Sequence, residues 1–297
     1  MTQGVRPVAV VTGASSGIGF AAAKALAAQG WKVIGIGRDK ARSQTAANAL
    51  AEVSPEADAV MLRADFSLMA DVQRIADEVL LLTDRIDVLI NNAGGMTDCL
   101  EMTSEGLEAN FAGNQLGPFL LTHRLLPLLR AAATNAPAGT VRVLVTSSYS
   151  SESAHGFNLD DTQNLAQFHP GLAYSWAKLA NVLFMRGLAA RLAGSGIVAH
   201  AMVPGTTASN FFSHAPQSTL DHVRDTPKHS AEVGADTLVW LATSEEAGRS
   251  SGGYWEKRQL RPHNPLADDK AVVDRCWDET IRLIERAGIA AEQFAFN

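Results

Sequence analysis

A tyrosine and a lysine lie four positions apart in the segment AYSWAKLAN, residues 173–181. The segment has an amphipathic helical pattern, so we expect Tyr174 and Lys178 on one helix face, about one turn apart. A free phenol titrates near pH ~10 and exchanges protons poorly at neutral pH. An ammonium beside it favours the phenolate and lowers its pKa, which would suit the pair to acid–base catalysis. The alternative is a surface contact between a cation and a phenol.

A glycine-rich turn, VVTGASSGIG, follows the first apolar run and precedes a helical pattern. Gly13, Gly17 and Gly19 would allow a tight turn and a close approach of the backbone to a pyrophosphate. The first turn of the helix would then offer free N–H groups to the phosphate oxygens. The spacing GxxxGxG differs from the usual dinucleotide fingerprint GxGxxG, so a plain strand–helix turn is the alternative.

The second apolar run ends in Ile36-Gly37-Arg38, where NAD-dependent enzymes carry an acid for the ribose hydroxyl. An arginine at this place can pair with the 2′-phosphate of NADP. We therefore expect NADP (as NADPH), with NAD less favoured. The alternative is a solvated loop arginine paired with Asp39.

These residues need a scaffold, and the chain supplies alternating β-rich and helical segments, which predict parallel βαβ units. We expect an α/β fold, a doubly wound parallel sheet with helices on both faces. Nothing marks a domain boundary, so residues 1–297 are expected to form one domain. The expected strands are 8–12, 32–37, 58–64, 87–93, 140–147 and 196–204, and the expected helices include 19–29, 71–82, 115–133 and 174–193. Three further segments are a polar insertion at 149–173, a lid loop at 206–230 and a C-terminal helix at 267–288.

The motifs TGASSGIG (12–19), NNAG (91–94), YSWAK (174–178) and VPG (203–205) occur in this order on those elements. With them the chain resembles the short-chain dehydrogenase/reductase family, which implies a Rossmann-type domain. The segments NQLGPFLLTH (114–123), SWAKLANVLF (175–184) and SGGYW (251–255) are similar to the retinol-dehydrogenase-like branch. Members of that branch often carry an N-terminal membrane anchor, and this sequence shows none.

The resemblance implies a catalytic tetrad of Asn, Ser, Tyr and Lys, with Tyr174 and Lys178 as its last two members. The serine is taken as the second of the pair in VTSSYS, Ser148, and not as Ser147. Ser148 would stabilise the oxygen of a carbonyl substrate, where negative charge develops. Tyr174 would deliver the proton, and Lys178 would tune the phenol and hold the nicotinamide ribose.

The asparagine of the tetrad is taken as Asn114, which lies in the N-x-L-G-x-F context, and not as Asn110. Asn114 would hold a water on the proton path from Lys178. In the family, Asp65 contacts the adenine, and the segment after Pro204-Gly205 reaches the nicotinamide carboxamide. The full expected cofactor set is Gly13, Ser15, Ser16, Gly17, Ile18, Gly19, Arg38, Asp65, Phe66, Asn92, Ala93, Gly94, Tyr174, Lys178, Pro204, Gly205, Thr206, Thr207 and Ser209.

Aromatic residues of the insertion and the lid loop are expected to form the substrate pocket. The predicted substrate-binding residues are Ser148, His155, Phe157 and Phe211, with Phe168, His169, Phe212 and His214 as further candidates for the walls. This content favours a medium-sized apolar or aromatic carbonyl, reduced to an alcohol. A reductase of carbon–carbon double bonds, like protochlorophyllide reductases, and a non-catalytic dinucleotide-sensing protein are the alternatives.

Composition excludes several other classes. The net charge is −6 and no basic stripe is present, which argues against a nucleic-acid partner. The two cysteines and eight histidines show no metal-ligand spacing, so we expect no metal. No secretory signal or membrane-spanning apolar run is visible, and we expect a cytoplasmic protein. By analogy, a homodimer would form through the helices carrying Asn114 and Tyr174, where Ala177 and Ala180 permit close approach, unless the C-terminal helix blocks it.

Overall fold

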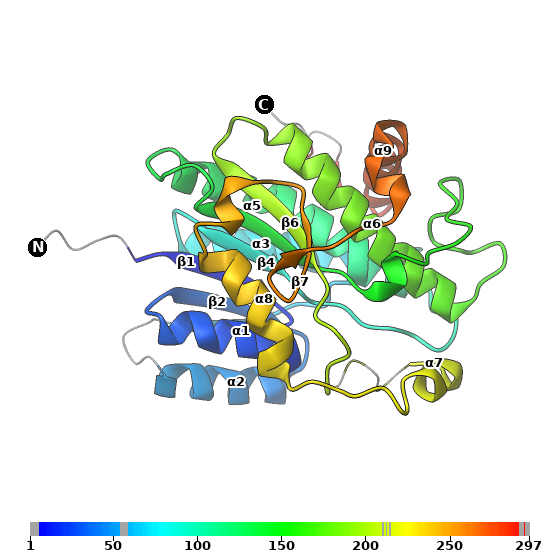
Figure 1. The fold of residues 1–297 in the computed structure, drawn as a ribbon, viewed down its shortest axis with the longest axis horizontal. Coiled ribbons are helices and arrows are strands. Elements are labelled where there is room, and N and C mark those ends of the chain that lie inside the picture. The colour runs from blue at the N-terminus through cyan, green and yellow to red at the C-terminus, as the bar shows by residue number, and fades with distance from the viewer. Residues whose placement is uncertain are drawn as a thin grey trace, which may run out of the picture.

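The computed structural model describes residues 6–53, 59–209, 211, 213, 215–290 and 294. Its centre is a sheet in the order β3-β2-β1-β4-β5-β6-β7-β8 (Figure 1). The strands are parallel from β3 to β7, and β8 is antiparallel to β7. Their bounds are β1 Val8–Thr12, β2 Lys32–Gly37, β3 Val60–Arg63, β4 Val88–Asn91, β5 Val141–Thr146, β6 Ile197–Met202, β7 Tyr254–Glu256 and β8 Gln259–Leu260.

The strand order places the cleft. The chain starts at β1, moves outward to β2 and β3, and then returns to the other side of β1 with β4. In such sheets ligands bind beyond the carboxyl ends of the strands, at the point where the order reverses. The predicted doubly wound sheet is confirmed, and all six predicted strands are present within a few residues. The short β7–β8 hairpin was not predicted.

Helices cover both faces of the sheet (Figure 1). One face carries α1, α2 and α8, whose apolar side chains pack around Leu26, Leu50 and Leu238. The other face carries α3, α5 and α6, which pack around Ile75, Phe119 and Leu179. The helix bounds are α1 Gly17–Ala28, α2 Lys40–Val53, α3 Met69–Leu82, α4 Ala109–Phe111, α5 Gly117–Ala133, α6 Pro170–Arg191, α7 Gln217–His222, α8 Ala231–Thr243 and α9 Lys270–Arg286. A π-helical turn, η1 (Ala112–Leu116), joins α4 to α5, and shorter 3-10 turns are η2 Tyr149–Ser151, η4 Ala247–Arg249 and η5 Pro265–Asp268.

The helix that carries the Tyr–Lys pair begins four residues earlier than predicted. Pro170 occupies the first turn of α6, where its fixed φ and missing N–H cost nothing. His169 caps the helix by accepting the N–H of Leu172 at its Nδ1, over 3.4 Å. The first residues of α6 therefore belong to the predicted polar insertion, 149–173, which continues into the helix without a break.

The C-terminal helix α9 packs across α5 and α6. Trp277 of α9 is 5% exposed, and its ring lies 4.7 Å from that of Phe119 and 5.7 Å from that of Phe184. Along α5, between α3 and α9, only Pro127 and Ala131 are exposed. Ala177 and Ala180, expected to face a second copy, are fully buried within the chain. Among the described residues, no helix combines the length and apolar character needed to cross a bilayer.

Candidate active site

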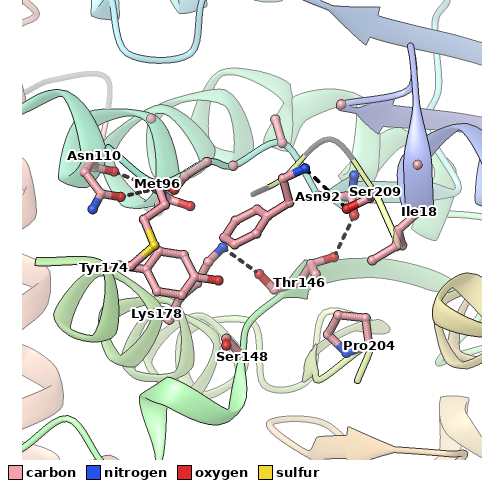
Figure 2. A pocket seen from close by; sticks show the side chains of 18 of the residues that line it. Ile18, Asn92, Met96, Asn110, Thr146, Ser148, Tyr174, Lys178, Pro204 and Ser209 are labelled. Carbon is pink, nitrogen blue, oxygen red and sulfur yellow. Dashed lines mark hydrogen bonds between the residues drawn. The ribbon is translucent and has the colours of Figure 1, made fainter. Parts of the chain in front are cut away.

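A cavity of about 1160 Å³ lies at the carboxyl ends of the strands. Segments that follow β1, β2, β3, β4, β5 and β6 all contribute to its walls, together with the first turns of α6. Figure 2 shows side chains from distant parts of the sequence, among them Ile18, Asn92 and Pro204, around one space. Of the expected cofactor residues, all except Gly19 line this cavity.

The three glycines of the first turn are each required by the backbone. Gly13 and Gly17 have φ of 68° and 56°, a region that favours glycine. A Cβ on Gly19 would lie 2.5 Å from both Gly13 O and Asn92 Nδ2, so Gly19 acts behind the cavity wall. The side chain of Ser16 does not cap α1, and the first N–H groups of a helix have no partner within it.

The turn is locked to the NNAG segment at the end of β4. Thr12 Oγ1 accepts the N–H groups of Asn92 and Ala93 at 2.9 Å and 2.8 Å. The Asn92 side chain donates to Thr12 O at 3.1 Å and accepts from Thr146 Oγ1 at 3.2 Å. Three neighbouring strands are thereby tied together below the cavity, which gives it a rigid floor.

Arg38 projects at the far end of the cavity, beyond β2. Its side chain is 67% exposed, and its guanidinium is 3.9 Å from the Asp65 carboxylate. Asp39 is the alternative partner of Arg38 that the sequence suggests, but its carboxylate accepts the N–H of Arg42 at 2.8 Å. Arg42 also lines the cavity and was missed from the sequence, although it lies one helical turn beyond Arg38. Two cations therefore border this end.

Tyr174 and Lys178 lie together on the cavity side of α6 (Figure 2). They are 8% and 4% exposed, and Lys178 Nζ lies 5.7 Å from the centre of the phenol ring. The ammonium donates to Thr146 O at 3.1 Å and to Asn181 Oδ1 at 3.5 Å. A surface contact, the alternative weighed from the sequence, does not fit this burial.

The same burial shifts both titratable groups toward their neutral forms. Burial lowers the pKa of Lys178 to about 7. Burial raises the pKa of Tyr174, and a hydrogen bond with the Ser148 side chain lowers it in part. The expected lowering of the phenol pKa by Lys178 is therefore not found in the protein alone, because desolvation of the phenolate outweighs the other effects.

The two serines of VTSSYS have different partners. Ser147 is 2% exposed, and its hydroxyl donates to the carbonyl of Lys178 at 2.9 Å. Ser148 is half-buried, and its hydroxyl accepts the N–H of Ser150 at 3.3 Å and meets the Tyr174 phenol. Only Ser148 has its hydroxyl directed to Tyr174, so the geometry favours it over Ser147.

Asn114 lies in the π-helical turn η1, 2% exposed. Its Nδ2 donates to Gly95 O at 2.9 Å and to Asn110 O at 2.8 Å, whereas its Oδ1 is buried and has no partner. A Cβ on Gly94 would lie 2.5 Å from that Oδ1 and 3.2 Å from Lys178 Nζ. A buried acceptor normally binds a donor or an ordered water, and this one borders the lysine.

The expected substrate residues divide into two groups. His155 is exposed and outside the cavity, and its carbonyl accepts from Trp176 Nε1 at 3.1 Å. Phe157 packs on Trp176 with ring centres 5.8 Å apart, so these two residues hold the insertion to α6 and lie outside the cavity wall. Phe168 is also outside the cavity wall, whereas His169 lines it.

Phe211 does lie at the site, with its ring 5.3 Å from that of Tyr174. Met96, Ala215 and Leu220 join Phe211 and Tyr174 in one apolar cluster. Met96 was missed from the sequence, although its position directly after NNAGG at the end of β4 could have indicated it. Phe212 and His214 lie outside the described residues.

The comparisons with known proteins agree with this geometry. The family model "short chain dehydrogenase" matches residues 7–159. Human retinol dehydrogenase 14 is 33% identical over 287 residues, covering 91% of this chain and 83% of the relative. A solved structure, a putative uncharacterized protein from Mycobacterium Paratuberculosis, has a TM-score of 0.74 and 29% identity over 94% of this chain and 93% of its own.

A second solved structure, the RhlG/NADP active-site complex of Pseudomonas aeruginosa, has a TM-score of 0.66 and 27% identity, covering 84% of this chain and 93% of its own. Sequence motifs, sheet order and cleft therefore agree with the family match. The chain belongs to the short-chain dehydrogenase/reductase family, in its retinol-dehydrogenase-like branch.

Proposed function

We propose that this protein is an NADP(H)-dependent oxidoreductase that interconverts a ketone or aldehyde and the corresponding alcohol. The observation that carries the proposal is the cluster of half-buried Ser148 with buried Tyr174 and Lys178 in a glycine-lined cavity. A nicotinamide dinucleotide would fit this cavity, because Gly13, Gly17 and Gly94 line it and have no side chains to keep a pyrophosphate away from the backbone. The bound cofactor would supply or accept the hydride.

The side chains supply position and proton transfer. Ser148 would donate a hydrogen bond to the substrate oxygen, where charge develops during reduction. Tyr174, within reach of the same oxygen, would give its proton to it and recover one through Lys178. Asn114 would hold a water at its unpartnered Oδ1, next to Lys178, and so extend the path toward solvent.

The end of the cavity at Arg38 supports NADP(H) over NAD. Arg38 and Arg42 border it, and a guanidinium binds a phosphate through a planar fork of donors. No carboxylate follows β2 directly to accept a ribose hydroxyl, since Arg38 occupies that place. The printed title of one structural relative names NADP, which agrees with this choice.

The apolar cluster at Phe211 supports a medium-sized apolar or aromatic substrate. Met96, Phe211 and Leu220 belong to one apolar cluster with Tyr174, so a carbonyl near the phenol would have its hydrocarbon part against this cluster. Several relatives are named retinol dehydrogenases, and retinol is an apolar alcohol. We place the protein in the cytoplasm, acting on a small molecule without nucleic acid.

The test is oxidation of NADPH and NADH with a panel of apolar aldehydes and ketones, with identification of the product. We expect alcohol formation with NADPH, and loss of turnover in Tyr174→Phe while NADPH binding is kept. Arg38→Asp should reverse the cofactor preference. A saturated carbon–carbon bond as product would indicate the alternative reductase, and binding without turnover on any substrate would indicate a sensor.

A further inference from the structure

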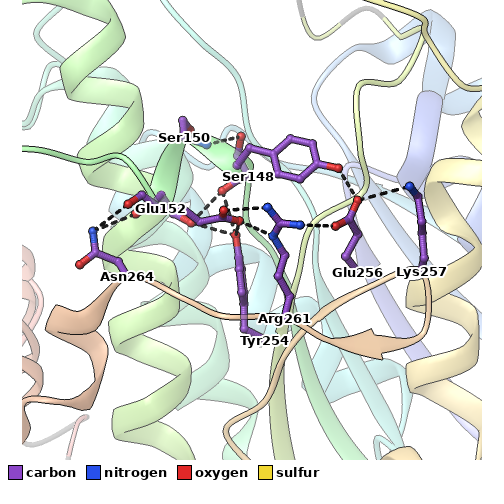
Figure 3. A network of polar contacts seen from close by, with 10 residues as sticks. Ser148, Ser150, Glu152, Tyr254, Glu256, Lys257, Arg261 and Asn264 are labelled. Carbon is purple, nitrogen blue, oxygen red and sulfur yellow. Dashed lines mark hydrogen bonds and ion pairs between the residues drawn. The ribbon is translucent and has the colours of Figure 1, made fainter.

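A network of charged side chains lies directly behind Ser148 (Figure 3). Its centre is the pair of Glu152 and Arg261, which join the segment 148–152 to the end of the β7–β8 hairpin. Arg261 Nε donates to Glu152 Oε1 at 2.7 Å, and Nη2 donates to Oε2 at 2.8 Å. Such a bidentate ion pair fixes the relative orientation of the two side chains as well as the distance between them. The β7–β8 hairpin is thereby bound to Glu152, four residues after the proposed catalytic serine, Ser148.

One arm of the network reaches the backbone of Ser148 itself. The Tyr254 hydroxyl is 3.1 Å from Ser148 O and 3.1 Å from Glu152 Oε1. The Ser151 hydroxyl already donates to Ser148 O at 2.7 Å, and a phenol has one proton. A carbonyl oxygen has a second lone pair, so the Tyr254 hydroxyl lies as a shared donor between Ser148 O and the Glu152 carboxylate, which Arg261 holds in place.

The other arm reaches the residue after Ser148. Arg261 Nη1 donates to Glu256 Oε2 at 2.6 Å, and the Tyr149 hydroxyl donates to the other oxygen of Glu256. The guanidinium of Arg261 also lies 4.9 Å from the centre of the Tyr149 ring. Tyr149 lines the cavity, so one guanidinium holds both ends of the turn that presents Ser148.

The charges in this network depend on Arg261. The side chains of Glu152, Arg261 and Glu256 are 27%, 33% and 13% exposed, so water screens them only in part. Burial raises the pKa of Glu256, but the hydrogen bond from Tyr149 and the charge of Arg261 outweigh this and leave it lowered. Without Arg261, the carboxylates of Glu152 and Glu256 would lose the cation that they share, and the exposed Lys257, 3.8 Å from Glu256, would remain beside one of them. Removing one member of a partly buried ion-pair network leaves the other charges without a partner. This destabilises the local structure more than replacing all members of the network does.

We propose that Arg261 is a positioning residue that holds the 148–152 turn so that the Ser148 hydroxyl faces Tyr174. This proposal rests on the proposed function for the role of Ser148 in the reaction. It adds that the hairpin, far from Ser148 in sequence, sets the rate of the chemical step. Arg261 itself does not touch the cofactor cavity.

The kinetic test compares Arg261→Met with Arg258→Met. Arg258 lies on the same hairpin and pairs with Asp236 on the surface, away from Ser148. We expect Arg261→Met to lower kcat by about 10- to 100-fold, as displacement of a reacting group does, with unchanged KM for NADPH. Arg258→Met should resemble the wild type. In a Ser148→Ala background, Arg261→Met should have almost no further effect. Unchanged kcat, or an equal loss in that background, would overturn the proposal.

A structural readout separates this proposal from the proposed function. Hydrogen exchange of the peptide 148–153 should be faster in Arg261→Met than in wild type, and unchanged in Arg258→Met. The faster exchange is expected even if the protein turns over no carbonyl compound. Absence of turnover would contradict the proposed function but not the positioning role of Arg261. Unchanged exchange in Arg261→Met would defeat the positioning alone. If the methionine variant does not fold, Arg261→Lys, which keeps the charge and loses the fork, replaces it in both measurements.

Discussion

At the scale of single residues, burial decides the chemistry of the Tyr–Lys pair. Lys178 and Tyr174 share one desolvated site, and each is shifted toward its neutral form. A lysine with a pKa of about 7 changes charge within the physiological range, which an exposed lysine does not. Proton supply to Tyr174 should therefore depend on pH near neutrality.

This gives a pH prediction for Lys178. The pKa is lowered to about 7, so the ammonium is present below pH 7 and is lost as the pH rises through it. Reduction needs the ammonium to support the phenolate left on Tyr174. We expect kcat/KM for NADPH, which reports the free enzyme, to be level below pH ~7 and to fall above it. In Lys178→Arg the fall should shift to much higher pH, and an unshifted profile would contradict the assignment.

Two adjacent glycines provide a matched pair of variants. A Cβ on Gly94 would lie 2.5 Å from Asn114 Oδ1, whereas a Cβ on Gly95 meets nothing within 4 Å. Because Asn114 is held by two backbone carbonyls, Gly94→Ala should displace it and lower kcat by about 10- to 100-fold. Gly95→Ala should stay close to wild type. Steady-state kinetics with a urea midpoint for each variant check this, and equal effects of the two would contradict it.

The sequence could predict the site residues that belong to ordered motifs, but not the placement of residues in irregular segments. Tyr174, Lys178 and the glycine turn lie on regular elements, whose periodicity fixes their relative positions. His155 and Phe157 lie in an irregular insertion, and the partner of Phe157 is Trp176, on the next helix. Local pattern does not encode such packing, so the sequence could not show that these two residues lie outside the cavity wall.

At the scale of elements, one buried residue, Glu108, connects the insertion to the segment carrying Asn114. The Glu108 side chain accepts the N–H groups of Asn110 and Phe111 at the start of α4, at 2.9 Å and 2.6 Å. The Glu108 N–H donates to Gln163 Oε1 at 2.7 Å. Burial raises the pKa of Glu108 to about 7, the backbone hydrogen bonds lower it in part, and the charge of Glu101 raises it further.

The raised pKa of Glu108 predicts a pH dependence of stability. Between its ordinary value of 4.5 and about 7, the folded protein keeps a proton that the unfolded chain has released. The free energy of unfolding should therefore decrease as the pH rises through this range, by at most about 3 kcal/mol, and level off above it.

Glu108→Gln lacks this titration, so it should gain stability relative to wild type between pH 5 and pH 7. Urea unfolding of both proteins at each pH measures the difference. Burial lowers the pKa of His123 to about 4 and also lowers that of His200, which gives the opposite slope. Both histidines are common to the two proteins and cancel in the comparison. A constant difference across the range would contradict the prediction.

The elements that sequence reasoning found are those with long apolar patterns. Five of the six predicted strands are buried almost throughout and read as continuous apolar runs, so they stand out, whereas the edge strand β3 is only partly buried. The β7–β8 hairpin has three and two residues, too few to show a period. The π-helical turn at Asn114 adds one residue to a helical turn, which periodicity alone does not reveal.

At the scale of the whole molecule, α9 determines which surfaces remain free. Trp277 fills the space over Gly187 of α6, where a Cβ would lie 2.9 Å from its ring. The guanidinium of Arg191 lies 4.0 Å from the centre of the same ring. The two long helices that would pair with a second copy by analogy are thus covered by the chain's own last helix.

We therefore expect a monomer in solution. A dimer through α5 and α6 would have to displace α9 and expose Trp277, Phe119 and Phe184 to water. Light scattering coupled to size exclusion should give the mass of one chain over a range of concentrations. A mass of two chains that persists on dilution would contradict this and would require another interface.

The place of α9 in the chain also has a consequence for biosynthesis. The ribosome makes residues 270–286 after the helices that they cover. Until they emerge, the aromatic surface of α5 and α6 is uncovered, a condition that favours aggregation of nascent chains. Messages stopped before Lys270 should yield mostly insoluble product, recovered when the α9 peptide is supplied in trans.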